Sequence, residues 1–97
     1  MLSIIIPVYN EANNLRPLHS RLMEVLNKLN KECEIIYVDD NSRDTSYSIL
    51  REFVQSDEKI KIIRLARNFG QTLAIQAGID YSKGDILSRN LLMRVGD

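Results

Sequence analysis

The 97-residue sequence contains few of the residues on which several classes of protein depend. It has one cysteine, Cys33, so it can form no intrachain disulfide, which suits a reducing compartment. It has one histidine, His19, so no Cys/His pair has metal-ligand spacing and no serine has a suitable histidine base. We expect His19 on the exposed side of a helix. No apolar run approaches eighteen residues, which argues against a transmembrane helix, and no basic segment precedes the first apolar run, which argues against a signal peptide.

Charge and glycine patterns exclude further classes. Thirteen basic and thirteen acidic residues cancel, so net charge predicts neither a nucleic-acid partner nor an anionic membrane surface. We interpret most of a local excess, at Lys59, Lys61, Arg64 and Arg67, as a solvated strand edge. No Gly-x-Gly-x-x-Gly follows the first apolar run and no Gly-Lys-Ser/Thr occurs, so the dinucleotide fingerprint and the P-loop are both absent.

The residues that are present predict one globular α/β domain. A hydrophobic content of 44% with 27% charged residues is ordinary for a soluble chain. Continuous apolar runs predict strands near 2–8, 34–39 and 60–66, and apolar residues at helical spacing predict helices near 14–30, 45–56 and 70–82. This alternation is typical of a parallel sheet with right-handed crossovers. A fourth strand begins at 85–87 but is incomplete, so we assign 1–87 to the domain and 88–97 to a divergent tail.

Several local features carry their own predictions. Pro7 lacks an amide donor, so we expect regular strand pairing to fail near it. We expect Asn13 or Asn14 to cap the first helix, and Asp44 or Thr45 the second. The apolar residues expected on the inner face of the first helix are Leu15, Leu18, Leu22, Val25, Leu26 and Leu29. The third helix has a small-residue face that would let it lie close against the sheet, formed by Ala74, Ala77 and Gly78.

The distinctive polar residues follow the three predicted strands, in segments 7–11, 39–42 and 67–70. Because the carboxyl ends of parallel strands meet at one edge of a sheet, these segments should lie together where α/β proteins bind ligands. The carboxylates of Asp39 and Asp40 accept hydrogen bonds from base or ribose donors, and Tyr9 offers an aromatic face. Arg67 suits phosphate oxygens. This set of groups favours a nucleotide ligand.

Each of these residues also has a simpler interpretation. Asp39 and Asp40 suit a turn that leads into a helix cap, and Pro7 and Tyr9 suit the end of a strand. Arg67 suits a surface ion pair. The convergence of three such junctions on one edge favours the nucleotide interpretation over these alternatives.

Segments 3–11, 37–45 and 67–71 resemble the N-terminal half of family 2 glycosyltransferases, most closely the polyprenyl-phosphate sugar transferases of the dolichol-phosphate mannosyl and bactoprenol glucosyl types. The likeness runs from Leu2 to about Ile86. It implies a GT-A, Rossmann-like nucleotide-binding fold. It further implies an inverting hexosyltransferase that moves a sugar from a UDP- or GDP-sugar to an acceptor, here a polyprenyl phosphate. The resemblance places the full-length enzyme at the cytoplasmic face of the membrane, and this chain, which lacks the C-terminal segments, in the cytoplasm.

The resemblance also assigns roles by position. Pro7, Tyr9 and Glu11 would line the nucleotide pocket. Asp39 would take the base or the ribose with Asp40 beside it. Arg67 would lie near the mouth of the pocket. No residue of this chain is assigned to catalysis or to a metal.

One departure from the family pattern limits what we expect of the chain. The family carries an Asp-x-Asp motif whose carboxylates hold Mg²⁺ or Mn²⁺, and by count it should fall near 91–93. The sequence there is Leu91-Leu92-Met93, and aliphatic side chains cannot ligate a hard cation. We therefore expect a truncated or frameshifted copy, or a fragment of a longer reading frame, that needs no cofactor and is inactive alone.

Two alternative interpretations remain at this stage. The chain could be a non-catalytic remnant or accessory module that binds a nucleotide weakly, or a partner through an open sheet edge. It could also be a plain α/β domain of the flavodoxin or receiver type. The second is disfavoured because the acidic pair of a receiver follows its first strand, whereas here the pair follows the second.

Overall fold

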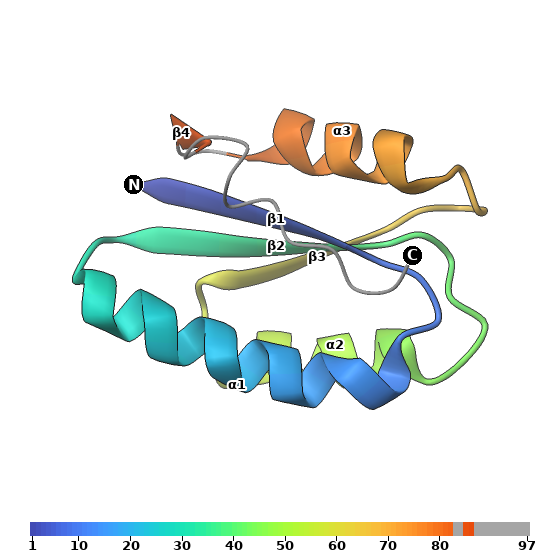
Figure 1. Cartoon of the computed structure of the whole chain (residues 1–97). Helices are drawn as coiled ribbons and strands as arrows, with labels where there is room; N and C mark the ends of the chain where they lie inside the picture. The colour runs from blue at the N-terminus through green and yellow to red at the C-terminus, as the bar shows by residue number, and fades with distance from the viewer. Residues whose placement is uncertain (83–84, 87–97) are drawn as a thin grey trace.

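A computed structural model describes residues 1–82 and 85–86 of the chain, so the expected tail at 88–97 lies outside the described residues. Strands and helices alternate from the first element to the last (Figure 1). This order confirms the predicted α/β class. The elements are β1 (Leu2–Val8), α1 (Ala12–Leu29), β2 (Cys33–Asp39), α2 (Ser46–Ser56), β3 (Ile60–Arg64), α3 (Gln71–Tyr81) and β4 (Asp85–Ile86).

The strands form one sheet in the order β3-β2-β1-β4, and every neighbouring pair is parallel. β1 and β2 pair along their whole length, from Leu2 opposite Cys33 to Val8 opposite Asp39. The parallel pairing confirms the crossover topology predicted from the alternation of strands and helices. It also brings the carboxyl ends of β1, β2 and β3 to the same edge.

Helices cover both faces of the sheet. α1 and α2 lie on one face and α3 on the other (Figure 1). Ile4 and Tyr37 belong to the core under α1 and α2, whereas Ile5 and Ile36 belong to the core under α3. Because β1 and β2 are buried on both faces, their sequences are continuous apolar runs rather than alternating ones.

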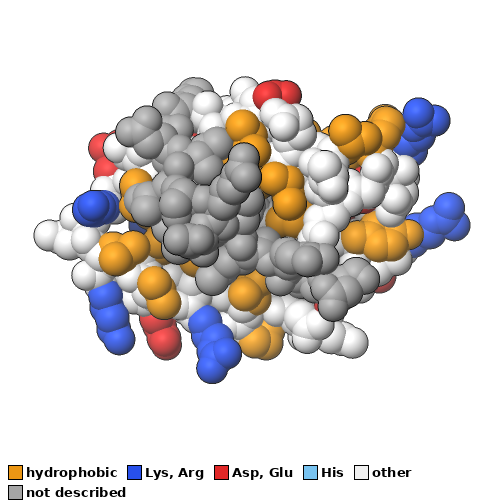
Figure 2. Space-filling view, turned by 45° about the horizontal axis from the view of Figure 1, so that its top comes forward, with side chains coloured by type: hydrophobic (Ala, Val, Ile, Leu, Met, Phe, Trp, Pro, Cys, Tyr) orange, Lys and Arg blue, Asp and Glu red, His pale blue; other side chains and the backbone are white. Residues whose placement is uncertain are grey.

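α3 lies close against the sheet, as its small residues predict. Ala74 is fully buried, and a methyl group added at Gly78 would overlap Ile5 and lie 3.1 Å from Val38 Cγ2. The outer side of α3 is partly apolar, and Figure 2 shows hydrophobic side chains at several places on this side of the molecule. Leu73 of α3 is an exposed apolar residue, with 53% of its surface exposed.

The prediction that pairing fails at Pro7 is wrong. β1 pairs with β2 through Val8, and Pro7 lies opposite Val38. The N–H of Asp40 donates to Val8 O over 2.8 Å, so the backbone of Val8 faces β2. Backbone groups alternate in direction along a strand, so the nitrogen of Pro7 faces the β4 side, where the described part of β4 reaches only as far as Ser3. Pro7 therefore removes no bond between β1 and β2.

The start of α1 also differs from the prediction. The helix begins at Ala12 and Glu11 occupies the N-cap position, so neither Asn13 nor Asn14 is the cap. The side-chain amide of Asn14 instead donates to Glu11 Oε2 over 2.6 Å. The second helix follows Thr45 at its N-cap position, but the side chain that accepts the N–H of its first residue belongs to Asp44.

The buried stripe of α1 is narrower than predicted. Leu15, Leu22 and Leu26 are buried, but Val25 and Leu29 are 50% and 43% exposed. Val25 projects about 80° away from Leu15 around the helix axis, and Leu29 is the last helical residue. His19 projects only about 40° from Leu15, so it falls within the stripe.

His19 is therefore half-buried, contrary to the prediction. Its Nδ1 lies 2.6 Å from Tyr37 Oη, and its ring stacks on Phe53 with centroids 4.1 Å apart. Burial lowers the pKa of His19 although the charge of Asp57 acts to raise it. Burial also raises the pKa of Tyr37 above its usual value. Both rings are thus neutral members of the core at pH 7.

Candidate functional site

The three loops that follow β1, β2 and β3 meet at the carboxyl edge of the sheet, as the sequence predicts (Figure 1). We call them the β1–α1 loop (residues 9–11), the β2–α2 loop (40–45) and the β3–α3 loop (65–70). Side chains of the β2–α2 loop contact the backbones of the other two. The middle loop therefore organises this edge.

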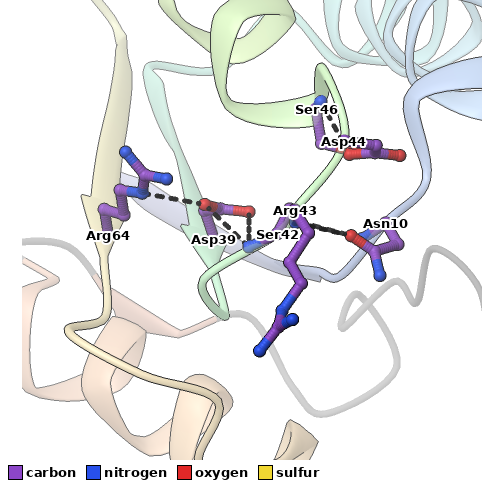
Figure 3. Close-up of polar contacts among 7 residues, drawn as sticks. All are labelled: Asn10, Asp39, Ser42, Arg43, Asp44, Ser46 and Arg64. Carbon is purple, nitrogen blue, oxygen red and sulfur yellow. Dashed lines mark hydrogen bonds and ion pairs between the residues drawn. The ribbon is translucent and has the colours of Figure 1, made fainter.

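Asp39 is the last residue of β2 and is fully buried. Both carboxylate oxygens lie 3.3 Å from the N–H of Ser42, and Oδ2 lies 3.5 Å from Arg64 Nε (Figure 3). The guanidinium of Arg64 also lies over the ring of Tyr47, 4.2 Å from its centroid. The oxygens of a buried carboxylate need such partners, so Asp39 is a fixed acceptor at the end of the central strands.

Asp40 is also buried, with 4% of its surface exposed, but it faces a different loop. Its Oδ1 accepts the N–H of Phe69 over 2.8 Å and its Oδ2 accepts the N–H of Gly70 over 3.0 Å. Gly70 has a φ of 96°, a backbone conformation that favours glycine. Asp40 therefore joins the end of β2 to the start of α3.

A second set of hydrogen bonds joins the β1–α1 and β2–α2 loops. The N–H of Asn10 donates to Ser42 Oγ over 2.9 Å. The side-chain Oδ1 of Asn10 accepts the N–H of Arg43 over 2.7 Å (Figure 3). The N–H of Glu11 donates to Ser46 Oγ over 2.9 Å. Asn10 has a φ of 53°, which asparagine tolerates better than most residues.

Asp44 links the amino ends of α1 and α2. Its Oδ1 accepts the N–H of Ser46 over 2.8 Å, and its Oδ2 accepts the N–H of Ala12 over 3.2 Å. Slight burial acts to raise the pKa of Asp44, but its hydrogen bonds with Ser46 and Ala12 outweigh this and lower it. A carboxylate at two helix amino ends is also favoured by both helix dipoles.

The residues assigned by the resemblance lie along this edge with different degrees of exposure. Pro7 is buried within β1, Tyr9 is 41% exposed just after it, and Glu11 is half-buried at the start of α1. Arg67 is exposed, and its guanidinium lies 4.7 Å from the ring centroid of Phe69. Among the described residues Arg67 forms no ion pair, so they offer no partner for the surface ion pair that was the simpler interpretation of Arg67.

The sequence did not reveal which residues connect the loops. Asn10, Ser42 and Asp44 have ordinary turn propensity, which gives no sign of a partner more than thirty residues away. Two of the basic residues that we interpreted as a solvated edge also have buried partners, because Arg64 pairs with Asp39 and Lys61 lies 2.7 Å from Glu34 Oε1.

The described residues do not fit a divalent cation. Within ranges 1–82 and 85–86, no group of three or more His, Cys, Asp or Glu side chains gathers in a way that could hold a metal. The oxygens of Asp39 and Asp40 accept backbone N–H groups instead. Positions 91–93, where the family pattern places its metal ligands, lie outside the described residues. No helix in the described part is long and apolar enough to cross a membrane.

Comparison with known proteins identifies the family. Residues 3–89 match the model of the family described as Glycosyl transferase family 2. An uncharacterized glycosyltransferase of Synechocystis sp. is 50% identical over 84 residues, which cover 87% of this chain and 26% of the relative. The undecaprenyl-phosphate 4-deoxy-4-formamido-L-arabinose transferase of Edwardsiella ictaluri is 41% identical over 87 residues, which cover 89% of this chain and 27% of the relative.

Solved structures share the fold at lower identity. S. aureus TarS in complex with UDP superposes with a TM-score of 0.73 and 21% identity, covering 97% of this chain and 27% of that chain. A mannosyltransferase of Pyrobaculum calidifontis in complex with GDP-Man and Mn²⁺ superposes with a TM-score of 0.66 and 20% identity, covering 84% of this chain and 24% of that chain. These likenesses confirm the predicted GT-A, Rossmann-like arrangement.

The chain spans about a quarter of the length of the curated relatives it matches. Within that span, the order of its elements, its family match and its relatives agree with the resemblance noted in the sequence. The chain belongs to glycosyl transferase family 2.

Proposed function

We propose that the carboxyl edge of this sheet is the nucleotide half of a sugar-transfer site. The observation that carries the proposal is the buried Asp39 carboxylate, held at the end of β2 by Ser42 and Arg64 where the three loops meet. In the whole enzyme such a site would bind a UDP- or GDP-sugar. The sugar would pass to a polyprenyl phosphate with inversion at the anomeric carbon.

Each residue has a separate role in this proposal. Asp39 accepts a hydrogen bond from the base or the ribose, because a rigid carboxylate selects a donor at one position. Tyr9, exposed after β1, lies against the flat base, and the forked guanidinium of Arg67 binds phosphate oxygens. Pro7 and Glu11 shape the wall from which Tyr9 extends.

Relatives and structural neighbours support the ligand classes. TarS was solved with UDP and the mannosyltransferase with GDP-Man, which supports a nucleoside diphosphate donor here. The Edwardsiella relative is named for transfer to undecaprenyl phosphate, which supports a lipid phosphate acceptor. By the same resemblance we place the whole enzyme at the cytoplasmic face of the membrane.

We further propose that the 97-residue polypeptide binds a nucleotide but does not transfer sugar. Leu91, Leu92 and Met93 stand where the family carries its metal-binding carboxylates. The mannosyltransferase neighbour was solved with Mn²⁺, in line with a divalent cation in the family. Apolar side chains offer such a cation no oxygen ligand, so we assign this polypeptide neither a cofactor nor a catalytic residue.

Calorimetric titration with UDP and GDP tests the nucleotide site. Asp39→Asn keeps the shape of the side chain but removes its charge, so affinity should fall by the equivalent of about 1–3 kcal/mol. Glu52→Gln is the matched control, because Glu52 is an exposed α2 carboxylate that pairs with Arg16. The control should bind as the wild type does. Equal binding by wild type and Asp39→Asn would refute the role of Asp39.

A further inference from the structure

Asp40 holds the β3–α3 loop through two consecutive backbone N–H groups. Each carboxylate oxygen accepts one of them, from Phe69 over 2.8 Å and from Gly70 over 3.0 Å. Among the described residues Asp40 forms no ion pair, and its side-chain oxygens bond to these two backbone N–H groups. The carboxylate is therefore directed toward this loop.

The same loop is held at its other end by the neighbouring residue. The N–H of Leu65, where the loop begins, donates to Asp39 O over 2.9 Å. The last residue of β2 and the residue that follows it thus hold both ends of the loop, through the backbone of Asp39 and the side chain of Asp40. Arg67 lies between these two anchors in the sequence. Its guanidinium packs on the ring of Phe69, and the N–H of Phe69 donates to Asp40.

We infer that Asp40 is a positioning residue: it fixes the β3–α3 loop and thereby holds the Arg67 guanidinium at the carboxyl edge, without contacting the nucleotide itself. This inference rests on the proposed function. It divides the acidic pair into two roles, since Asp39 meets the ligand and Asp40 places the cation that meets its phosphates. The division predicts that Asp40 affects phosphate binding and leaves nucleoside binding unchanged.

A first experiment needs no ligand. In amide hydrogen exchange, Asp40→Asn should speed exchange at Phe69 or Gly70 about tenfold or more, because an asparagine oxygen can accept one of the two N–H groups. Asp40→Ala should release both. Asp44→Asn is the matched control, because it removes a carboxylate with the same two-amide pattern from the other loops and should affect Ala12 and Ser46 instead. Unchanged protection at both Phe69 and Gly70 in Asp40→Ala would overturn the inference.

A second experiment compares UDP with uridine, and GDP with guanosine, for the wild type and for Asp40→Asn, Arg67→Ala and the double variant. Each single change should weaken diphosphate binding on the order of tenfold. The double variant should bind the diphosphate no more weakly than the weaker-binding single variant, because both changes act through the Arg67 guanidinium. Nucleoside binding should stay unchanged in all three variants, whereas Asp39→Asn should weaken it.

Two results would contradict the role of Asp40. Loss of nucleoside affinity in Asp40→Asn would mean a direct contact, and additive losses with Arg67→Ala would mean that the two residues act independently. A wild type that binds neither a diphosphate nor a nucleoside would refute the proposed function and this role together. The exchange experiment separates that failure from a failure of the loop anchor.

Discussion

His19 Nδ1 and Tyr37 Oη lie 2.6 Å apart across the interface between α1 and β2. Phe53 of α2 stacks on the histidine ring and also lies beside the ring of Tyr37, so the three rings join α1, β2 and α2 within the core. A neutral imidazole can accept the tyrosine O–H, and burial keeps both groups neutral. This contact makes the stability of the domain sensitive to pH.

The free energy of unfolding should fall as the pH drops below 6.5. Burial lowers the pKa of His19 below the unfolded value of 6.5, so between these two values the unfolded chain binds more protons than the folded one. Stability therefore declines from pH 6.5 toward the folded pKa and levels off below it. Urea midpoints between pH 7.5 and 5 measure this decline, and His19→Gln, which does not titrate, should flatten it. An equal decline in His19→Gln would exclude His19 as its source.

Gly78→Ala should destabilise the domain, although alanine is the better helix former by about 1 kcal/mol. The added methyl would overlap Ile5 and press on Val38, and overpacking of this kind costs roughly 1–3 kcal/mol. Gln76→Ala, on the exposed side of α3, is the control and should be nearly neutral. A higher urea midpoint for Gly78→Ala would mean that α3 does not lie against the sheet as described.

Lys61→Met should cost more stability than Lys59→Met. Lys61 lies 2.7 Å from Glu34, which is 2% exposed, so its loss removes a charged partner from a buried carboxylate and costs about 1–3 kcal/mol. Lys59 lies 3.8 Å from the more exposed Asp57, and such a surface pair contributes little. Denaturant unfolding of both variants gives the comparison. Similar losses would show that the Lys61 pair is no stronger than a surface pair.

The 97-residue polypeptide should transfer no sugar when supplied with UDP- or GDP-sugar, a divalent cation and polyprenyl phosphate. A version extended with a family-like C-terminal half that includes the Asp-x-Asp motif implied by the resemblance should transfer sugar. A radiolabelled-sugar assay on both polypeptides compares them directly. Metal-dependent turnover by the short polypeptide would overturn the prediction.

The sequence predicted the parallel sheet because its decisive signals are local. Continuous apolar runs marked the strands buried on both faces, and the small side chains of Ala74 and Gly78 marked a helix close to the sheet. Pairing past Pro7 could not be predicted, because it depends on which side of β1 the missing donor faces. The half-buried position of His19 depends on Tyr37 and Phe53, which come from other elements.

The edge location of the candidate site was predictable for the same reason, since strand ends are visible in the sequence. The loop connections were not, because each joins residues far apart along the chain. Asp40 appeared equivalent to Asp39 in sequence, but the fold directs Asp40 to Gly70 and Asp39 to Arg64. Neighbouring residues on a strand face opposite sides of the sheet, so adjacent carboxylates at a strand end meet different partners.

We expect the carboxyl edge of the sheet to bind the nucleotide, and amide chemical-shift mapping during titration with UDP and GDP is the direct test. The largest shifts should occur in the three loops and the end of β2, at residues 9–11, 39–45 and 65–70, and should weaken in Asp39→Asn. The turn at 30–33 and residues 57–59, at the opposite edge, serve as the internal control and should not move. Shifts concentrated at that opposite edge, or none with either nucleotide, would contradict nucleotide binding at the carboxyl edge.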